Sequence, residues 1–491
     1  MATLIVRHGQ CISHIGFSAP ARLSDILIHN GFAQEHPCGG RGLCGKCSIL
    51  IEGNLSSPTP IEKEYGCRLS CQTILYGDAV VTLPHAMSLA QIEGGSGKDI
   101  QPASPMSKHI GAAVDIGTTT MVLRLYDMSS GHCIGLSSML NSQGAIAADV
   151  IGRIDAALRG GADTLCYLVE AAILQLITSA CTQCSIPPDQ LDAMVITGNT
   201  TMLYLLTARN PAALSKAPFM ADCYFGFETT LLKRRVFLPD CLHAFVGADI
   251  TCAILASGIL DKQESALLCD IGTNGELALW HRGLLYISST AAGPAFEGAG
   301  ISCGCGSIPG AIDRVEWLDG QLVCHTIAEQ RAIGLCGSGL VDAVAALLAA
   351  DIIDDTGFME DDEIVLQDKI RLTRADIRSV QLAKAATYAG IMSLLSVANC
   401  SSDKISSVFL AGGFGSHLNL RSAVRIGLIP VELADKIQVI GNAALDGAAM
   451  LLMNTGLRHK AASIRQITQH VRLDGNPDFV QRYVDAMMFE E

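Results

Sequence analysis

The chain has 491 residues, of which 49% are hydrophobic and 17% are charged, and its formal net charge at pH 7 is −14. This composition is typical of a folded chain, and a prior of ~150 residues per domain predicts about three structural units. Because the charge is acidic and no block of Lys or Arg interrupts it, the sequence argues against a nucleic-acid partner.

The first residues alternate as in a strand and lack the charged segment and apolar run of a signal peptide. The richest apolar run, residues 339–350, is interrupted by Asp342 and followed by Asp351. A membrane-spanning helix needs about 20 apolar residues, so we expect no membrane partner. We therefore predict a cytoplasmic location, in which the 19 cysteines would not form disulfides.

The first 84 residues contain several predicted strands and one helix. Strands are expected at residues 3–6, 12–17, 48–52 and 78–83, and the helix at residues 23–30. A glycine-rich loop that carries three cysteines follows this helix. Strands, one helix and further strands, with the cysteine loop after the helix, predict a β-grasp domain.

Four cysteines of this segment have the spacing of a metal-cluster site. Cys38, Cys44 and Cys47 form a C-x₅-C-x₂-C pattern, and Cys71 follows after 23 further residues. A cluster needs four converging thiolates, and a glycine-rich loop can direct backbone N–H groups at its sulfurs. The alternative is a zinc site, but zinc knuckles usually come as paired CxxC units, and this segment has one. The pattern therefore favours a [2Fe–2S] cluster.

The cysteine spacing resembles that of adrenodoxin-type ferredoxins, whereas plant-type ferredoxins have four residues between the first two ligands. The segment Arg-Leu-Ser-Cys-Gln, residues 68–72, is similar to the fourth-ligand segment of that class. The resemblance therefore implies Cys71, rather than its neighbour Cys67, as the fourth ligand.

Two segments of the larger, C-terminal part repeat one pattern. Residues 113–123 and 268–278 each contain a buried strand, the sequence Asp-Ile-Gly-Thr and a returning strand. One such turn is common, but two in separate halves resemble the superfamily of acetate and sugar kinases, Hsp70 and actin (ASKHA). A turn glycine lets backbone N–H groups approach phosphate oxygens, and the threonine hydroxyls add donors.

The resemblance implies an ATP site between two lobes. Asp115 and Asp270 would face each other across the cleft and hold Mg²⁺ through waters. Asp249 could orient the attacking water, or it could instead cap the apolar helix that follows it. The implied nucleotide-binding residues are Gly117, Thr118, Thr119, Thr120, Gly272, Thr273, Asn274, Gly412, Gly413 and Phe414. The last three belong to a loop that would pack on the adenosine.

Two further segments resemble the connecting helices of this superfamily. Residues 441–449 are mostly small and would let the two lobes shear past each other, and residues 245–249 precede the first connecting helix. The predicted fold class is thus α/β and α+β, a β-grasp ferredoxin domain joined to a two-lobed nucleotide-binding domain.

A stretch rich in Gly, Ser and Pro separates these parts, which predicts a flexible linker. The predicted domains are the ferredoxin-like domain at 1–84, the linker at 85–108 and the ATP-binding domain at 109–491, with lobes at roughly 109–265 and 266–491.

Stretches at residues 197–202, 290–298, 336–342 and 381–386 make nearly the whole chain resemble the reductive activators of corrinoid proteins. This resemblance implies ATP-dependent reduction of an inactive Co(II) corrinoid to Co(I) in a methyltransferase system. The implied partners are a corrinoid protein and an upstream electron donor. One departure is that longer members carry an additional small domain after the cluster domain, and this chain lacks it.

Three alternatives remain from the sequence. The chain could be an ATP-gated electron donor to another low-potential metalloenzyme such as a dehydratase, although those activators typically carry a [4Fe–4S] cluster between two subunits. It could be a redox-sensing nucleotide-binding regulator, which would need little ATP hydrolysis. A small-molecule kinase would leave the ferredoxin domain without an obvious role.

Overall fold

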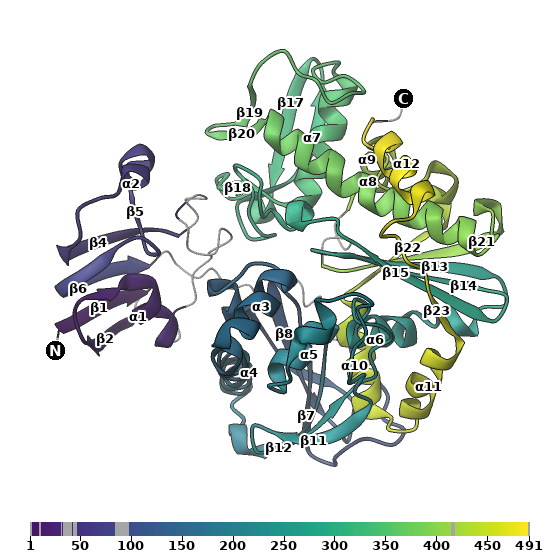
Figure 1. Ribbon diagram of the computed structural model, residues 1–491, viewed down its shortest axis with the longest axis horizontal. Coiled ribbons are helices and arrows are strands. Elements are labelled where there is room, and N and C mark those ends of the chain that lie inside the picture. Colours follow the sequence, from purple (N-terminus) through teal and green to yellow (C-terminus); the bar gives the residue numbers. More distant parts are fainter. Residues whose placement is uncertain are drawn as a thin grey trace.

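The computed structural model describes residues 2–8, 11–30, 32, 42, 47–83, 98–413 and 418–489. Figure 1 shows a small N-terminal unit at the left and a larger part that consists of two lobes. Each of these three parts contains its own six-stranded sheet.

The N-terminal unit is a mixed sheet with the order β2-β1-β6-β4-β5, and β3 pairs with β6. β1 runs antiparallel to β2 and parallel to β6, as in a β-grasp. The four predicted strands and the helix are present, whereas β3, α2 and β5 were not predicted because they are short. The elements are β1 (Ala2–His8), β2 (Cys11–Phe17), β3 (Ala21–Arg22), α1 (Leu23–His29), β4 (Ser48–Leu55), α2 (Pro60–Tyr65), β5 (Arg68–Leu69) and β6 (Ile74–Leu83).

Helix α2 fixes the segment that precedes Cys71. Thr59 and Glu62 form a capping box at its start, and Pro60 occupies the first turn. The buried Glu62 carboxylate also accepts hydrogen bonds from Arg68 Nε at 3.0 Å and from the Leu69 backbone at 2.9 Å. These bonds attach the segment around β5 to α2.

The first lobe contains a sheet with the order β11-β12-β10-β7-β8-β9. β7, β8 and β9 form an antiparallel meander, and β10 pairs with β7 in parallel. Its strands are β7 (Ile110–Ile116), β8 (Thr120–Asp127), β9 (Cys133–Leu140), β10 (Leu191–Gly198), β11 (Phe227–Leu231) and β12 (Arg234–Leu238). Its helices are α3 (Val150–Ala156), α4 (Ala162–Gln183), α5 (Thr200–Leu206) and α6 (Ala248–Ser257).

The second lobe repeats this arrangement in the order β22-β21-β13-β14-β15-β23. β13, β14 and β15 form the meander, and β21 pairs with β13 in parallel. Its strands are β13 (Ser265–Ile271), β14 (Gly275–His281), β15 (Leu284–Thr290), β21 (Ile405–Ala411), β22 (Ile437–Gly441) and β23 (Thr468–His470). The repetition places the turn between β7 and β8 and the turn between β13 and β14 at equivalent positions.

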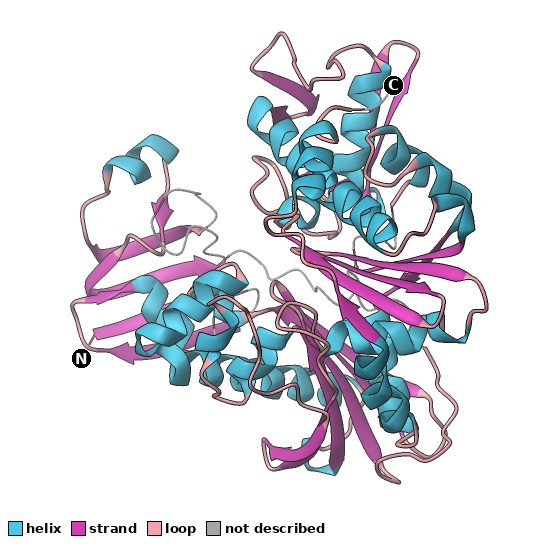
Figure 2. Cartoon of the chain, turned by 45° about the vertical axis from the view of Figure 1, so that its right-hand side comes forward, coloured by secondary structure: helices cyan, strands magenta, loops and turns pink. Residues whose placement is uncertain are grey.

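The remaining strands and helices all come after β15 in the chain. The small sheets are formed by β16 (Ala311–Leu318), β17 (Gln321–Thr326) and β18 (Gly334–Leu335), and by β19 (Glu363–Gln367) and β20 (Ile370–Thr373). The helices are α7 (Gly337–Ala349), α8 (Arg374–Val397), α9 (Leu420–Arg425), α10 (Ala443–Met453), α11 (Leu457–Ile464) and α12 (Pro477–Asp485). Figure 2 shows helices on both faces of the second-lobe sheet.

The sequence of strand β13 is almost continuously apolar because both of its faces are buried. Leu267 and Cys269 belong to the core under α7 and α8, whereas Ala266 and Leu268 belong to the core that contains α6 and α10. Because both faces of the strand are covered, neither face can carry a polar row.

Helices α6 and α10 lie between the two large sheets (Figure 1) and share one hydrophobic core with strands of both lobes. They approach closely, since a Cβ on Gly447 would lie 2.0 Å from the Cys252 carbonyl oxygen. These are the two helices that the sequence predicted to connect the lobes.

Residues 98–108 of the predicted linker are held by the large domain. Lys98 Nζ lies 3.1 Å from Asp446 Oδ2, and the Met106 backbone donates to the Leu452 carbonyl oxygen at 3.0 Å. The rest of the predicted linker, residues 85–97, lies outside the described residues.

Two helical segments are long and apolar enough to cross a membrane by length and composition alone. They are Val150–Gln183 and Arg374–Val397, and 50% and 72% of their most apolar windows are buried inside the protein. Core helices of this length pass the same test, so the observation is weak evidence for a membrane span.

Candidate functional site

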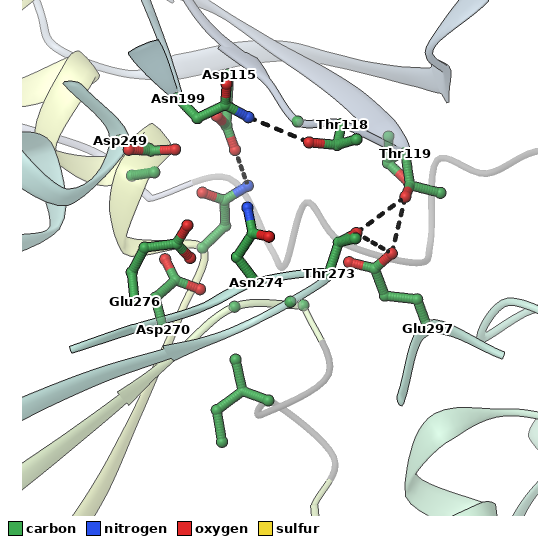
Figure 3. A pocket seen from close by; sticks show the side chains of 18 residues that line it. Asp115, Thr118, Thr119, Asn199, Asp249, Asp270, Thr273, Asn274, Glu276 and Glu297 are labelled. Carbon is green, nitrogen blue, oxygen red and sulfur yellow. Dashed lines mark hydrogen bonds between the residues drawn. The ribbon is translucent and has the colours of Figure 1, made fainter. Parts of the chain in front are cut away.

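The two equivalent turns meet in a cavity of about 130 Å³ between the lobes. Figure 3 shows side chains from both lobes pointing into it. The predicted residues that line it are Asp115, Gly117, Thr118, Thr119, Thr120, Asp249, Asp270, Gly272, Thr273, Asn274, Gly412 and Gly413. The remaining predicted residue, Phe414, lies outside the described residues.

In both turns the glycine backbone N–H donates to a carbonyl oxygen further along the loop, three residues on in the first turn and two residues on in the second. The Gly117 backbone donates to the Thr120 carbonyl oxygen, and the Gly272 backbone donates to that of Asn274, both at 3.0 Å. A Cβ on Gly117 would lie 2.5 Å from the Thr120 carbonyl oxygen, so this tight turn requires glycine. The sequence repeat therefore corresponds to a repeated turn.

A buried arginine braces the first turn. Arg153 donates to the Thr118 carbonyl oxygen at 2.5 Å, and burial lowers its pKa to about 10. Asn199 begins α5 and donates from Nδ2 to the Thr118 hydroxyl at 3.1 Å. These two contacts hold the turn in place on the first-lobe side.

The third predicted loop crosses the second turn closely. Gly412 has a φ of 96°, and a Cβ there would lie 2.7 Å from the Ile271 carbonyl oxygen and 2.9 Å from Asp270 Oδ1. Only glycine allows both this positive φ and this close approach at low cost. The glycine therefore lets the end of β21 reach the cavity.

Partly or fully buried carboxylates dominate the charge of the cavity. Burial raises the pKa of Asp115 to about 7 and that of Asp270 to about 7, and the Asp249 charge adds to both effects. Burial also raises the pKa of Asp249 to about 6 and places the pKa of Glu276 well above its usual range. None of the described residues that line the cavity is Lys or Arg. The cavity therefore favours a cation or a cation-bound ligand.

Asp249 does not cap its helix. Gly247 is the N-cap residue of α6, and Asp249 lies in the first turn with its side chain toward the cavity (Figure 3). Asp249 is therefore not the N-cap residue, although its Oδ1 accepts a hydrogen bond from the Ile250 backbone at 2.8 Å, and its role in orienting water stays a prediction.

Sequence reasoning missed several lining residues. Asn199, Glu276, Glu297 and Asn442 all line the cavity. Asn199 and Glu297 lie in stretches that resemble the activators, at 197–202 and 290–298, and Asn442 lies in the predicted connecting helix at 441–449, but only the fold shows that these stretches converge. Glu276 comes shortly after the second turn and lies directly opposite Asp270 on the neighbouring antiparallel strand. This pairing with a predicted site residue could have identified it.

The acidic side chains are not arranged as a direct metal cage. Among the described residues, no group of three His, Cys, Asp or Glu side chains could hold a metal ion. This arrangement agrees with a cation held through water or through a ligand's own oxygens.

Two of the four predicted cluster ligands are described, and they converge. The Cys47 and Cys71 sulfurs lie 3.2 Å apart, and both residues are buried. The hydrogen bond from Cys47 lowers the pKa of Cys71 to about 6 and raises that of Cys47, because the pair shares one proton. Burial raises the pKa of the neighbouring Cys67. Two converging thiols, one of them acidic, suit thiolate ligation of iron; Cys38 and Cys44 lie outside the described residues.

The large domain matches two described families in succession. Residues 110–262 match the RACo middle region, and residues 264–491 match the C-terminal domain of RACo, the ASKHA domain. The corrinoid activation enzyme RamQ of Eubacterium limosum is 34% identical to the chain, and the alignment covers 97% of each protein. The chain belongs to the corrinoid activation enzymes. The predicted family and the ASKHA fold class are thus confirmed.

Two other relatives agree with this family. A protein of Methanosarcina barkeri named [Co(II) methylated amine-specific corrinoid protein] reductase is 26% identical over 70% of each chain. A solved reductive activator for corrinoid, iron-sulfur protein superposes with a TM-score of 0.74 at 25% identity, over 100% of this chain and 98% of that chain. The corrinoid activation enzymes also differ in length: the alignment with RamQ spans 579 positions, more than the 491 residues of this chain.

Proposed function

We propose that this protein reductively activates a corrinoid protein of a methyltransferase system, coupling ATP hydrolysis to the transfer of one electron to Co(II), which becomes Co(I). The observation that carries the proposal is the pairing, in one chain, of converging cysteines with an acidic cavity between two repeated turns. The relatives named as activators and as a Co(II) corrinoid protein reductase support this activity.

The cavity would bind ATP with Mg²⁺. Asp115, Asp249 and Asp270 would hold the cation through waters, since desolvation raises their pKa values and no Lys or Arg is among the described residues that line the cavity. The turns at 117–120 and 272–274 would contact phosphate oxygens through their N–H and hydroxyl donors. Gly412 and Gly413 would leave room for the adenosine.

The N-terminal unit would hold a [2Fe–2S] cluster through Cys38, Cys44, Cys47 and Cys71. Such a cluster supplies single electrons at low potential. The chain's own contribution is to bury Cys47 and Cys71 and to place Gln72 Nε2 as a donor 3.6 Å from the Cys71 sulfur. An upstream donor would return the electron.

The domain boundaries at 84 and 109, the absence of nucleic-acid and membrane partners and a cytoplasmic location belong to the same proposal. Separate hydrophobic cores support the boundaries: one lies in the N-terminal sheet, and others lie in the two lobes.

The test is a reduction assay under anaerobic conditions. The reduced protein is mixed with a Co(II) corrinoid protein, and the Co(I) absorption band is followed with and without MgATP. We expect Co(I) only with MgATP, and in neither an Asp115→Ala nor a Cys44→Ala variant. An intact cluster and measurable ATP hydrolysis, but no Co(I) with several corrinoid proteins, would instead support an ATP-gated electron donor for another enzyme.

A further inference from the structure

The carboxylate of Glu297 binds hydroxyl groups from both repeated turns. Thr119 of the first lobe and Thr273 of the second lobe each donate to Glu297 Oε2 at 2.8 Å, and the two hydroxyl oxygens lie 3.4 Å apart. Figure 3 shows Glu297 at one end of the cleft, away from Asp249, Asp270 and Glu276. One anionic oxygen of the chain itself thus bridges the two lobes.

These contacts place the carboxylate where a phosphate oxygen would bind. A threonine hydroxyl has one hydrogen, so Thr119 and Thr273 cannot donate to Glu297 and to a phosphate oxygen at the same time. The other carboxylate oxygen, Oε1, lies over the second turn, 3.3 Å from the position of a Cβ on Gly272. A carboxylate and a phosphate are both anions that accept several hydrogen bonds, so each can occupy this position.

The size of the cavity agrees with an occupied phosphate position. Its volume of about 130 Å³ is smaller than the ~300–1,000 Å³ of typical ligand pockets. A second bond between the lobes, from Asn442 Nδ2 to Asp115 Oδ2 at 3.2 Å, crosses the opposite side of the cavity. A nucleotide therefore needs the Glu297 bridge to open before its phosphates can enter.

The backbone around Glu297 is anchored, whereas its side chain has room to turn. Ala295 and Phe296 are buried in the second-lobe core, and Glu297 itself is only partly buried. Gly293 and Gly298 flank this short helical turn with φ values of 79° and 76°. Rotation of the Glu297 side chain can therefore free both threonines without unpacking the core.

We propose that Glu297 is an internal competitor for the terminal phosphate of the nucleotide, and that it sets which nucleotides can open the cleft. This inference rests on the proposed ATP site. A nucleotide whose phosphates reach both turns replaces both hydrogen bonds of Glu297. A nucleoside monophosphate cannot reach both turns, so it binds without displacing Glu297.

The experiment measures nucleotide affinity by calorimetry on the full chain with Mg²⁺. The ligands are AMPPNP, a non-hydrolysable ATP analogue, and AMP. We expect Glu297→Ala to tighten AMPPNP binding about tenfold, which is about 1.4 kcal/mol, and to leave AMP binding within twofold. Glu297→Gln, which keeps the shape but not the charge, changes AMPPNP affinity in the same direction by a smaller factor.

The matched control is Glu264→Ala, which removes one exposed negative charge outside the cavity, directly before the second lobe. We expect this variant to leave both affinities within twofold of the wild type. Unchanged or weaker AMPPNP binding in both Glu297 variants would overturn the inference, and so would a gain in AMP affinity equal to the gain in AMPPNP affinity. In either case, AMPPNP binding by the wild type would still support the ATP site. An absence of AMPPNP binding in every chain would overturn the ATP site as well.

Discussion

At the scale of single residues, the cavity carries negative charge that the folded chain neutralises only in part. Asp115 illustrates the cost: desolvation and the Asp249 charge raise its pKa to about 7, although the Asn442 amide donates to it and the Arg124 charge acts in the opposite direction. Such a group destabilises the unliganded fold when it is ionised. We expect this cost to be retained because the charge is needed when Mg²⁺ and nucleotide are bound.

The first prediction concerns Asp115→Asn. At pH 8 we expect the unliganded variant to be more stable than the wild type by up to about 4 kcal/mol, because a desolvated charge whose pKa is raised from about 3.9 to about 7 is removed and the amide oxygen can still accept from Asn442. ATP hydrolysis should fall by about 100-fold or more. Urea unfolding and phosphate release measure the two effects, and a variant that is both less stable and fully active would contradict this account.

The second prediction is that the stability gained by Asp115→Asn depends on pH. In the folded wild type Asp115 titrates near 7, whereas an unfolded aspartate titrates at about 3.9. Between these values the folded state binds the extra proton, so the wild type loses stability relative to the variant as the pH rises from about 4 to about 7. The stability difference should be near zero at pH 4 and constant above pH 8. Unfolding curves of both chains across this range provide the measurement, and a constant difference would refute the raised pKa.

At the scale of elements, α6 and α10 decide how the lobes meet. Gly447 lies in α10, where a Cβ would be 2.0 Å from the Cys252 carbonyl oxygen of α6. The same helix begins after Asn442, which contacts Asp115, and carries Asp446, which pairs with the buried Arg124 at 2.5 Å. The spacing of the two helices therefore bears directly on the first phosphate turn.

The third prediction is the effect of Gly447→Ala. In an exposed helix this change stabilises by about 1 kcal/mol, but here the added Cβ forces α10 away from α6. We expect a loss of about 1–3 kcal/mol in unfolding free energy and weaker nucleotide binding. Gly306→Ala is the control, because nothing lies within 4 Å of its Cβ position. Equal stability of both variants would show that the close contact between α6 and α10 does not limit the stability of the protein.

At the scale of the whole molecule, the cluster unit and the nucleotide domain have separate cores. The N-terminal core contains residues of β1, β2, β4, β6 and α1 and none of the large domain. Among the described residues, the segment from 98 onward is attached to α10 through Lys98 and Asp446. Damage to one unit should therefore leave the chemistry of the other intact.

The fourth prediction uses this independence. Cys71→Ser should abolish the visible absorption of the cluster and Co(I) formation, while ATP hydrolysis stays within about twofold. Cys67→Ser is the matched control, because its thiol lies nearby with a raised pKa and should leave the cluster in place. Cluster loss in the Cys67 variant alone would assign the fourth ligand to Cys67 instead.

The sequence by itself determined the local chemistry of this protein. The cysteine spacing, the two Asp-Ile-Gly-Thr turns and the Gly-Gly loop are short-range patterns, because a tight turn or a ligand loop constrains neighbouring residues. The four strands and the helix of the N-terminal unit followed from periodicity, whereas the two connecting helices followed from the resemblance to the ASKHA superfamily. These patterns also carried the family resemblance that the relatives confirm.

Only the tertiary structure decided which distant residues share the cavity. Glu297 lies 178 positions from Thr119, and Asn442 lies 327 positions from Asp115, yet each pair is hydrogen-bonded. No local pattern encodes such contacts, since they depend on the crossing of α6 and α10 and on the register of two sheets. The same long-range packing buries the carboxylates and raises their pKa values, because desolvation is a property of the folded surroundings and not of the residue.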